Sequence, residues 1–471
     1  MPETNYIEKQ GSMAMGDEPS NIERGSRASS AIFVLLCSLP VFTTILFGGV
    51  DSATWILIIF CATAIFLLWL AETRNVGGFP IGKSNLPIPL AALILIGLIQ
   101  LAPLGGGEHA GISTSTALSS DPFSTRLFVV RLLVYFVFFS ACLTFINNEG
   151  RIKKATIFII VFGALMAFFA ILQRLANPDG IYGMRETPQA ISFGPFVNQH
   201  HFASFMQMTA GVTLGLLLGS SIERDRKVLL GILFVAMGVA AVWTSSRGGL
   251  VGFIAVIIMA ALLSFVSRGE KHREKSTESN QKLIAAGTAA ALLLVIFGVV
   301  LMLGGGDLLL RGTGVGVEGG DLSTGRAHFW PIALRIFFEN PVLGAGLDAF
   351  GAAFTKHDTW NGMLRVEQAH NEYLQILADA GIAGIACLAA FIFLLFRGSL
   401  KVIASGSGFR REAAVGALAG CFGILIHSFF DFPLRTPSNA FFFLMLAVIA
   451  TVPVAIVNKA RMHRRRSSSE H

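Results

Sequence analysis

The chain has 471 residues, of which 53% are hydrophobic and only 14% are charged, and its mean hydropathy is +0.66. Soluble domains typically carry about 25% charged residues. The composition therefore excludes an ordinary cytosolic enzyme, a disordered chain and a water-exposed coiled coil, and it predicts an integral membrane protein.

The net charge of +7 does not indicate a nucleic-acid partner, because the densest basic cluster directly follows an apolar segment near the C-terminus. Such clusters anchor a helix end at the anionic cytoplasmic leaflet, so membrane lipids are the expected partner. The five cysteines all lie in apolar segments without the spacing of metal ligands, and we interpret them as small hydrophobic residues. We expect no metal and no cofactor.

An apolar stretch of about 20 residues spans the hydrocarbon layer as a helix. On this criterion we predict an all-α, polytopic membrane protein with about twelve transmembrane helices. The predicted spans are 31–48, 52–70, 86–103, 125–146, 155–174, 200–220, 228–244, 248–266, 283–303, 373–396, 413–430 and 439–457. The predicted domain organisation is a disordered cytoplasmic N-terminus (1–30), nine transmembrane helices (31–303), one long outer-face loop (304–372), three transmembrane helices (373–457) and a basic cytoplasmic tail (458–471).

The distribution of basic residues predicts the orientation. Lys and Arg concentrate in every second connection, as the positive-inside rule requires if both termini are cytoplasmic. The long loop 304–372 then lies on the outer face. Within it, Ser323-Thr324 offers an N-cap for a helix that Asn340-Pro341 ends, and a turn and a short second helix are expected to follow.

Arginines that face outward run against the positive-inside trend, and two have informative surroundings. Arg247 lies in TSSRGGLVG, where two glycines would let the backbone approach a phosphate at the next helix N-terminus. The alternative is an arginine that snorkels at a helix end. Arg326 opens the loop helix, where a cation opposes the helix dipole by about 0.3–1 kcal/mol unless an anion compensates it; Arg335 reads as a solvated helix residue.

His370 lies in EQAHNEYLQILADAG, between the long loop and the tenth span. An imidazole there can accept a proton near neutral pH, and Asn371 and Glu372 are placed to orient it, although a lone histidine also serves as a structural residue. His200-His201 and His427 with Asp431 suggest a metal site only weakly, because the usual ligand spacing is missing. Candidate supporting residues are Arg185, His201, Arg435 and Glu372.

Five segments together carry a family resemblance. They are GPFVNQHHFASFM, TSSRGGLVGF, STGRAHFWPIALRIFFENPVLGAGLDAF, AHNEYLQILADAGIAG and HSFFDFPLRTPSNAFFF. In this order they resemble the bacterial O-antigen ligase and polysaccharide polymerase family, and the last looks like the polymerase-type members. The resemblance covers roughly residues 194–442.

The resemblance implies a GT-C-like, inverting and metal-independent glycosyltransferase of the bacterial inner membrane. Its donor would be an undecaprenyl-pyrophosphate-linked glycan, and its acceptor a hydroxyl of a glycan or of a lipid A-core-like molecule at the outer face. By the same resemblance Arg247 and Arg326 would bind the pyrophosphate and His370 would act as the base.

Twelve spans also suit a transporter or flippase, which is the alternative hypothesis. Transporters place ionisable residues near the membrane midplane. Here the predicted spans are nearly free of internal charge, with Arg131 the main exception, and this distribution favours the enzyme. The roles of Arg131, His200 and His427 stay open, as do the sugar, the acceptor and the oligomeric state. The choice between a ligase, a polymerase and a protein O-glycosylating enzyme is open as well.

Overall fold

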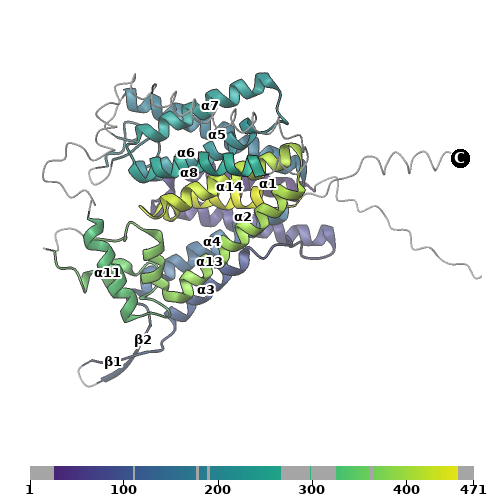
Figure 1. Cartoon of the computed structure of the whole chain (residues 1–471). Helices are drawn as coiled ribbons and strands as arrows, with labels where there is room; N and C mark the ends of the chain where they lie inside the picture. The colour runs from purple at the N-terminus through teal and green to yellow at the C-terminus, as the bar shows by residue number, and fades with distance from the viewer. Residues whose placement is uncertain are drawn as a thin grey trace, which may run out of the picture.

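A computed structural model describes residues 26–109, 112–176, 180–187, 191–266, 298, 325–360 and 365–453. Within these residues the protein is an all-α bundle, apart from a two-stranded antiparallel hairpin (Figure 1). Almost all of the predicted ninth span and of the N-terminal segment, and the whole basic tail, lie outside the described residues.

The elements follow one another along the chain with these bounds: α1 Arg27–Ile45, η2 Phe47–Gly49, α2 Ser52–Val76, α3 Pro87–Leu101, β1 Gly105–His109, β2 Ile112–Thr116, α4 Pro122–Phe145, α5 Glu149–Ala176, α6 Gln199–Leu218, α7 Arg224–Trp243, α8 Arg247–Val266, α11 Arg326–Glu339, α12 Phe350–Thr355, α13 Glu372–Ser405, α14 Gly408–His427, η3 Pro433–Arg435 and α15 Pro437–Thr451.

In the part of the chain that the structure describes, eight helices are long and apolar enough to cross a membrane: α1, α2, α4 to α8 and α13. Two more apolar helices, α3 and α15, have only 15 residues each, which is about 22 Å of helix against roughly 30 Å of hydrocarbon. Helix α14 begins with charged residues. The structure thus supports a polytopic helical membrane protein with eight candidate spans, and the number twelve and the GT-C-like fold stay predictions.

Close contact between α6 and α14 forms the centre of the bundle (Figure 1). Each helix carries two glycines four residues apart, Gly211 and Gly215 on α6 and Gly416 and Gly420 on α14. A Cβ added to Gly215 would lie 2.4 Å from the Cα of Gly416, and one on Gly211 would lie 2.6 Å from the amide nitrogen of Gly420. Small residues at this spacing let two membrane helices approach to backbone contact.

Helix α13 is bent where the chain that follows α11 packs against it. Gly381 has φ +61° and ψ −156°, outside the helical range, and the amide of Ile382 donates to the carbonyl of Pro341. Gln100 of α3 joins the same junction, because its side chain donates to the carbonyls of Leu343 (2.5 Å) and Asp379 (2.9 Å). The segment after α11 is therefore fixed to α3 and α13.

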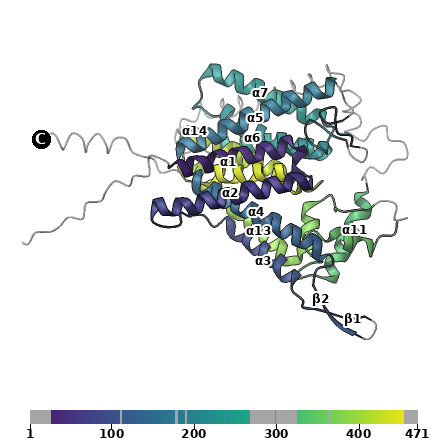
Figure 2. The ribbon, with the colours of Figure 1, turned by 180° about the vertical axis from the view of Figure 1, so that it is seen from behind.

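Both ends of the described chain lie at one end of the bundle. The Thr44 hydroxyl near the end of α1 lies 2.5 Å from that of Ser438 near the start of α15, and the two helices pack against each other, so they run antiparallel. Figure 2 shows α1 from the side on which it covers the bundle. The start of α1 and the end of α15 are therefore together. The opposite end of the bundle carries α11, α12 and the hairpin (Figure 1).

Candidate functional site

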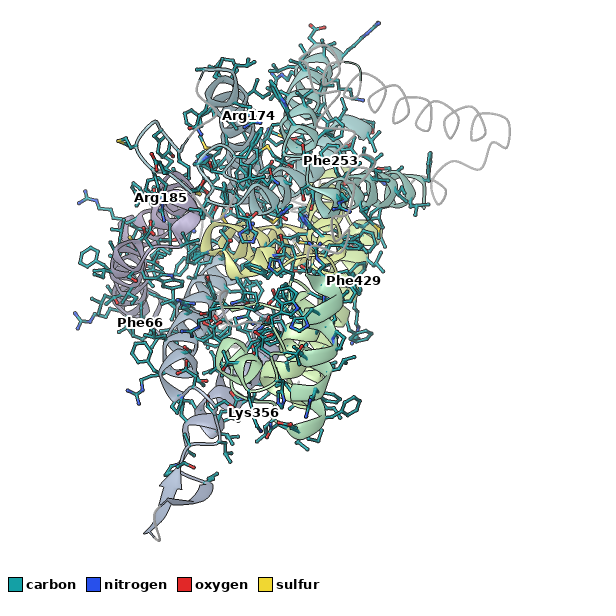
Figure 3. All side chains as sticks on the ribbon, turned by 90° about the vertical axis from the view of Figure 1, so that its left-hand side faces the viewer. Phe66, Arg174, Arg185, Phe253, Lys356 and Phe429 are labelled. Carbon is teal, nitrogen blue, oxygen red and sulfur yellow. The ribbon has the colours of Figure 1, made fainter. Side chains whose placement is uncertain are left out.

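The segments that the sequence analysis singled out meet around residues 427–431, which we call the α14 turn. The amide of Glu372 donates to the carbonyl of Ser428 (2.9 Å), and the Tyr373 ring packs on Phe429, with centroids 4.2 Å apart. Figure 3 looks onto this end of the bundle, where Phe429 is labelled between the upper helices and α11 to α13. The turn thus joins the start of α13 to the end of α14.

His370 lies directly before the N-cap of α13. The N-cap residue Asn371 accepts hydrogen bonds from the amides of Tyr373 and Leu374, which fixes the start of the helix. The His370 Nδ1 lies 3.2 Å from Oδ1 of Asp431. Its side chain is 35% exposed, whereas that of Asp431 is 1% exposed, so a buried carboxylate holds a ring that solvent can reach.

The surroundings of Asp431 favour the ionised form of its carboxyl. Burial by itself raises the pKa of the Asp431 carboxyl, but the hydrogen bond to His370 and the nearby rings of His201 and His200 outweigh it, and the net pKa lies well below the ordinary range. Oδ1 also accepts from the amide of Phe432 at 2.9 Å. A carboxylate that stays charged at neutral pH orients the imidazole and stabilises its protonated form.

Arg326 is the first residue of α11 and reaches the same turn. Its Nε and Nη2 donate to the carbonyl oxygen of Phe430, at 3.1 and 2.7 Å. The residue before the helix is Gly325 at φ +84°, and the expected cap residues Ser323 and Thr324 lie outside the described residues. Arg326 thus places a guanidinium at the N-terminus of α11, directly beside the α14 turn.

Arg247 is the exposed first residue of α8. Its neighbour Gly248 packs against the α14 turn, because a Cβ there would lie 2.8 Å from the His427 ring and 2.9 Å from Cβ of Phe430. We expected this glycine to make room for a ligand, and instead it makes room for the turn. The consequence is that Arg247, Arg326 and His370 all lie on elements that contact residues 427–431.

The three histidines of the helix ends have separate partners. The Nδ1 atoms of His200, His201 and His427 lie 2.8, 2.6 and 2.6 Å from the hydroxyls of Ser246, Thr436 and Ser204, respectively. The His201 ring also meets Phe432 edge to face at 5.0 Å, and Phe432 meets His370 in the same way at 5.0 Å. His201 therefore supports the packing beneath His370. Among the described residues no group of three metal-ligating side chains comes together.

Arg435 belongs to an adjacent buried ion network. Its guanidinium pairs with Asp348 (2.5 Å), Asp379 (2.8 Å) and Glu372 (3.4 Å), and it lies 5.2 Å above the Phe128 ring. Arg131, whose role the sequence left open, contacts the second oxygen of Asp348 at 3.4 Å. Arg435 and Glu372 thus tie the start of α13 to η3 and to the segment after α11.

Arg185 lies elsewhere in the fold. It forms a bidentate pair with Asp51, at 2.5 and 3.0 Å, and its guanidinium lies 4.5 Å from the centre of the Phe47 ring. These contacts connect the chain after α5 to the start of α2, and none of them joins Arg185 to the α14 turn.

Backbone strain is concentrated near the site. Among the described residues, five that are not glycine have positive φ, and three of them are Ser245 (+59°), Asp348 (+62°) and His370 (+51°). Ser245 precedes Arg247 by two residues, and Asp348 is a partner of Arg435. Strained residues persist only where their surroundings hold them, and they gather at functional sites.

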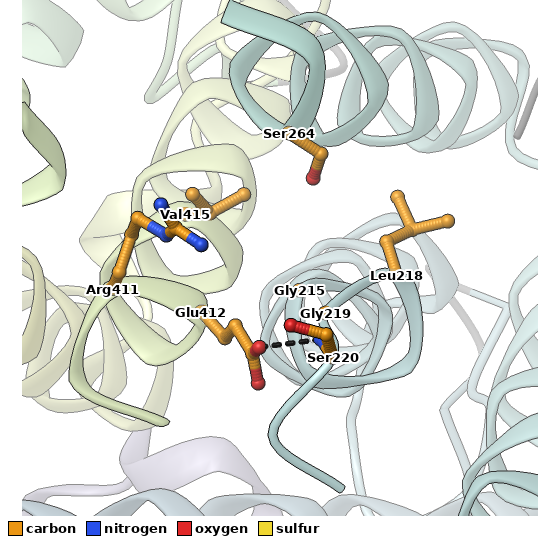
Figure 4. Close-up of a pocket in the computed structure, with 8 residues that line it drawn as sticks. All are labelled: Gly215, Leu218, Gly219, Ser220, Ser264, Arg411, Glu412 and Val415. Atoms are coloured by element: carbon orange, nitrogen blue, oxygen red, sulfur yellow. Dashed lines mark hydrogen bonds between the residues drawn. The ribbon is translucent and has the colours of Figure 1, made fainter. Parts of the chain in front are cut away.

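A small pocket lies at the opposite end of the bundle (Figure 4). Its buried Glu412 accepts hydrogen bonds from the amides of Ser220 (2.6 Å) and Ser221 (2.9 Å), which satisfies the chain where it leaves α6. This pattern is that of a helix-end support, and it shares no residue with the α14 turn.

Sequence comparison bears on the class of protein. Residues 232–389 match the family described as O-antigen ligase, a span that includes Arg247, Arg326 and His370. No curated protein matches the chain. The described part of the chain thus combines eight apolar helices with a similarity to the O-antigen ligase family over this segment. The match supports an O-antigen ligase-related family, whose members are membrane glycan-transferring enzymes.

Proposed function

We propose that this protein is a membrane glycosyltransferase that takes an undecaprenyl-pyrophosphate-linked glycan and joins it to an acceptor hydroxyl at the outer face of the inner membrane. The acceptor is a growing glycan or a lipid A-core-like molecule. The observation that carries the proposal is the meeting of Arg326, the start of α8 at Arg247 and the His370–Asp431 pair on one five-residue turn.

In the proposed reaction His370 is the base. Its Nδ1 is engaged by Asp431, so Nε2 is the ring atom that can accept a proton. The acceptor oxygen forms a bond to the anomeric carbon, the bond from that carbon to the pyrophosphate oxygen breaks, and the hydroxyl proton passes to Nε2. A single displacement of this kind inverts the anomeric centre. Asp431 stabilises the imidazolium that results.

Arg247 and Arg326 are proposed to hold the leaving pyrophosphate. A guanidinium matches phosphate oxygens in a bidentate manner and keeps its charge at any physiological pH. Negative charge builds on the bridging oxygen as the bond breaks, so fixed cations stabilise the transition state more than the ground state. Each arginine is the first residue of its helix, α8 or α11, and a helix N-terminus adds a partial positive charge.

A transporter or flippase is the second candidate, and the buried network around Arg435 is the observation that favours it. Asp379 lies within the apolar helix α13 and is fully buried. Ionisable groups inside membrane helices mark transport pathways in many proteins. Here, however, Asp379 is paired with Arg435 and with Gln375, at 2.8 and 3.2 Å, so the network is closed rather than open to a passing ion.

The test uses the purified full-length protein in liposomes with a synthetic undecaprenyl-pyrophosphate oligosaccharide. One arm adds core oligosaccharide lipid as acceptor and the other adds only more donor. We expect undecaprenyl pyrophosphate to be released in step with new glycosidic bonds, with the first arm active for a ligase and the second for a polymerase. Movement of intact labelled donor across the bilayer without release would establish the transporter instead.

Arginine variants refine this test. Arg247→Ala and Arg326→Ala should each abolish or severely reduce transfer, and the lysine variants should recover only part of it, because an ammonium cannot form the bidentate contact. Arg335→Ala is the matched control, since Arg335 is an exposed residue on the same helix as Arg326. Full activity in both alanine variants would remove these arginines from the mechanism.

A further inference from the structure

We propose that the exposed indole of Trp360 is a binding platform for a sugar ring of the acceptor glycan. This inference rests on the proposed glycan transfer and deepens it, because it assigns a subsite to a region outside the α14 turn. The geometric basis is a continuous row of rings, Trp360, Phe329 and His370, that leads from an exposed surface to the proposed base.

Trp360 is exposed yet held rigidly. Its side chain is 46% accessible, and the imidazole of His328 stacks on it, with the ring centroids 4.3 Å apart and the planes at 6°. Asp358 fixes both partners, because its Oδ1 lies 2.8 Å from Nε2 of His328 and accepts from the amide of Trp360 at 3.0 Å. The imidazole covers one face of the indole, and the accessible part of the ring is the part available to a ligand.

The row continues inward to the base. The Phe329 ring meets the indole at a steep angle with centroids 5.7 Å apart, and it stacks with His370 at 6.0 Å. Trp330 donates from Nε1 to the carbonyl of Ala369 at 3.1 Å, so α11 is anchored to the residue directly before His370. Only one phenyl ring therefore separates the exposed indole from the imidazole.

The chemistry of this platform suits a sugar. A pyranose presents C–H groups on one face and hydroxyls around its rim, while an indole offers an apolar electron-rich face and an N–H donor at its edge. Such a ring is a large, rigid contact surface that loses little conformational entropy on binding. An exposed indole pinned in place in a membrane protein's loop thus matches a saccharide better than an extended peptide, which would need a row of backbone partners.

The position in the row assigns the platform to the acceptor. Arg326 points to the carbonyl of Phe430, on the side of the α14 turn where the pyrophosphate of the donor is proposed to lie. Phe329 lies on the same helix as Arg326 but stacks on the His370 ring itself. The acceptor is the substrate that loses its proton to this imidazole. A sugar resting on Trp360 would belong to the molecule whose hydroxyl faces Nε2.

The experiment compares Trp360→Ala, Trp360→Tyr and Phe338→Ala in liposomes with the full-length protein. Phe338 is the control, because it is 73% exposed on the same helix as Phe329, and its ring contacts only Phe337 among the described rings. Loss of one stacking platform should raise the acceptor KM about tenfold in Trp360→Ala, leave the donor KM unchanged, and spare most affinity in Trp360→Tyr. Phe338→Ala should match the parent protein.

Two fluorescence measurements test directly whether Trp360 binds a glycan or lies in the membrane interface. Free core oligosaccharide or repeat-unit oligosaccharide, added alone, should change the fluorescence of the parent protein but not that of a Trp360→Phe variant. In liposomes of brominated lipid, quenching that disappears in Trp360→Phe would show instead that the indole lies in the membrane interface, and would overturn the proposal.

The outcomes separate the two proposals. If the parent protein transfers glycan and Trp360→Ala keeps its acceptor KM, the platform is wrong and the proposed function stands. If the parent protein transfers no glycan with either acceptor, the proposed function is wrong. An equal rise in donor and acceptor KM in Trp360→Ala would mean a structural role, and it would also overturn the platform.

Discussion

His370 and Asp431 are 61 residues apart in the sequence. The sequence therefore did not predict that the imidazole and the carboxylate form a pair. The local sequence predicts a proton-accepting base, because His370 directly precedes the start of a helix. Its partner depends on how α13 and α14 pack, which no local pattern encodes. The same holds for Arg435, whose carboxylate partners lie on two segments, Asp348 before α12 and Glu372 and Asp379 on α13.

Replacing His370 by Ala should lower turnover by about 10²–10⁴-fold, because general-base assistance is lost while the donor still binds. Asp431→Asn should lower turnover less, since the amide holds the ring but does not stabilise its protonated form. Glycan transfer by reconstituted variants measures both. His357→Gln is the control, as His357 is a buried loop histidine whose Nε2 lies 3.2 Å from Glu339. Near-normal turnover in His370→Gln would exclude the base role.

Arg435 should matter first for stability. Arg435→Met would leave the carboxylates of Asp348, Asp379 and Glu372 without their shared cation, and breaking a buried ion pair costs about 3–5 kcal/mol. We expect a large fall in the thermal unfolding temperature of the detergent-solubilised protein. Combining Arg435→Met with Asp379→Asn should restore part of that fall, because one buried charge is then removed. A variant that unfolds like the parent would show that the network is dispensable.

At the scale of elements, hydropathy predicted where the helices lie, and tertiary packing decided the details. The expected span 373–396 is the first part of a helix that runs to Ser405 and bends at Gly381. That bend follows from the backbone contact with Pro341, which only the folded chain brings near. The hairpin β1–β2 was not predicted, since its segment is rich in Gly, Ser and Thr and carries no alternating apolar pattern.

The glycine contact between α6 and α14 should tolerate no side chain. In Gly215→Ala the new methyl group would meet the Gly416 backbone at 2.4 Å, and overpacking of this kind costs about 1–3 kcal/mol. Gly231→Ala on α7 is the control, because a Cβ there has open space within 4 Å and alanine favours a helix by about 1 kcal/mol. Thermal unfolding in detergent should show Gly215→Ala below the parent protein and Gly231→Ala at or above it. Equal stability of the two variants would contradict this account of the core.

At the scale of the whole molecule, the bundle has two chemically different ends. One end gathers the α14 turn, the ring row on α11 and the exposed start of α8. The other gathers the two ends of the described chain and the basic start of α7. A lipid-linked donor has its pyrophosphate at the membrane surface and its tail among the helices, so a site confined to one end of an apolar bundle meets the geometry of that substrate.

The orientation of these ends in the membrane follows from the distribution of basic residues and is open to a direct test. Lys356, on the α11 side, is predicted to be outside, and Arg226, at the start of α7, to be inside; their side chains are 71% and 73% exposed. In a background with the five native cysteines replaced, Lys356→Cys should react in intact spheroplasts with a maleimide that cannot cross membranes. Arg226→Cys should react only after the membrane is opened, because the leaflet that attracts Lys and Arg faces the cytoplasm. Labelling of Arg226→Cys alone in intact spheroplasts would invert the topology, place the α14 turn in the cytoplasm, and remove the outer-face glycan transfer proposed for it.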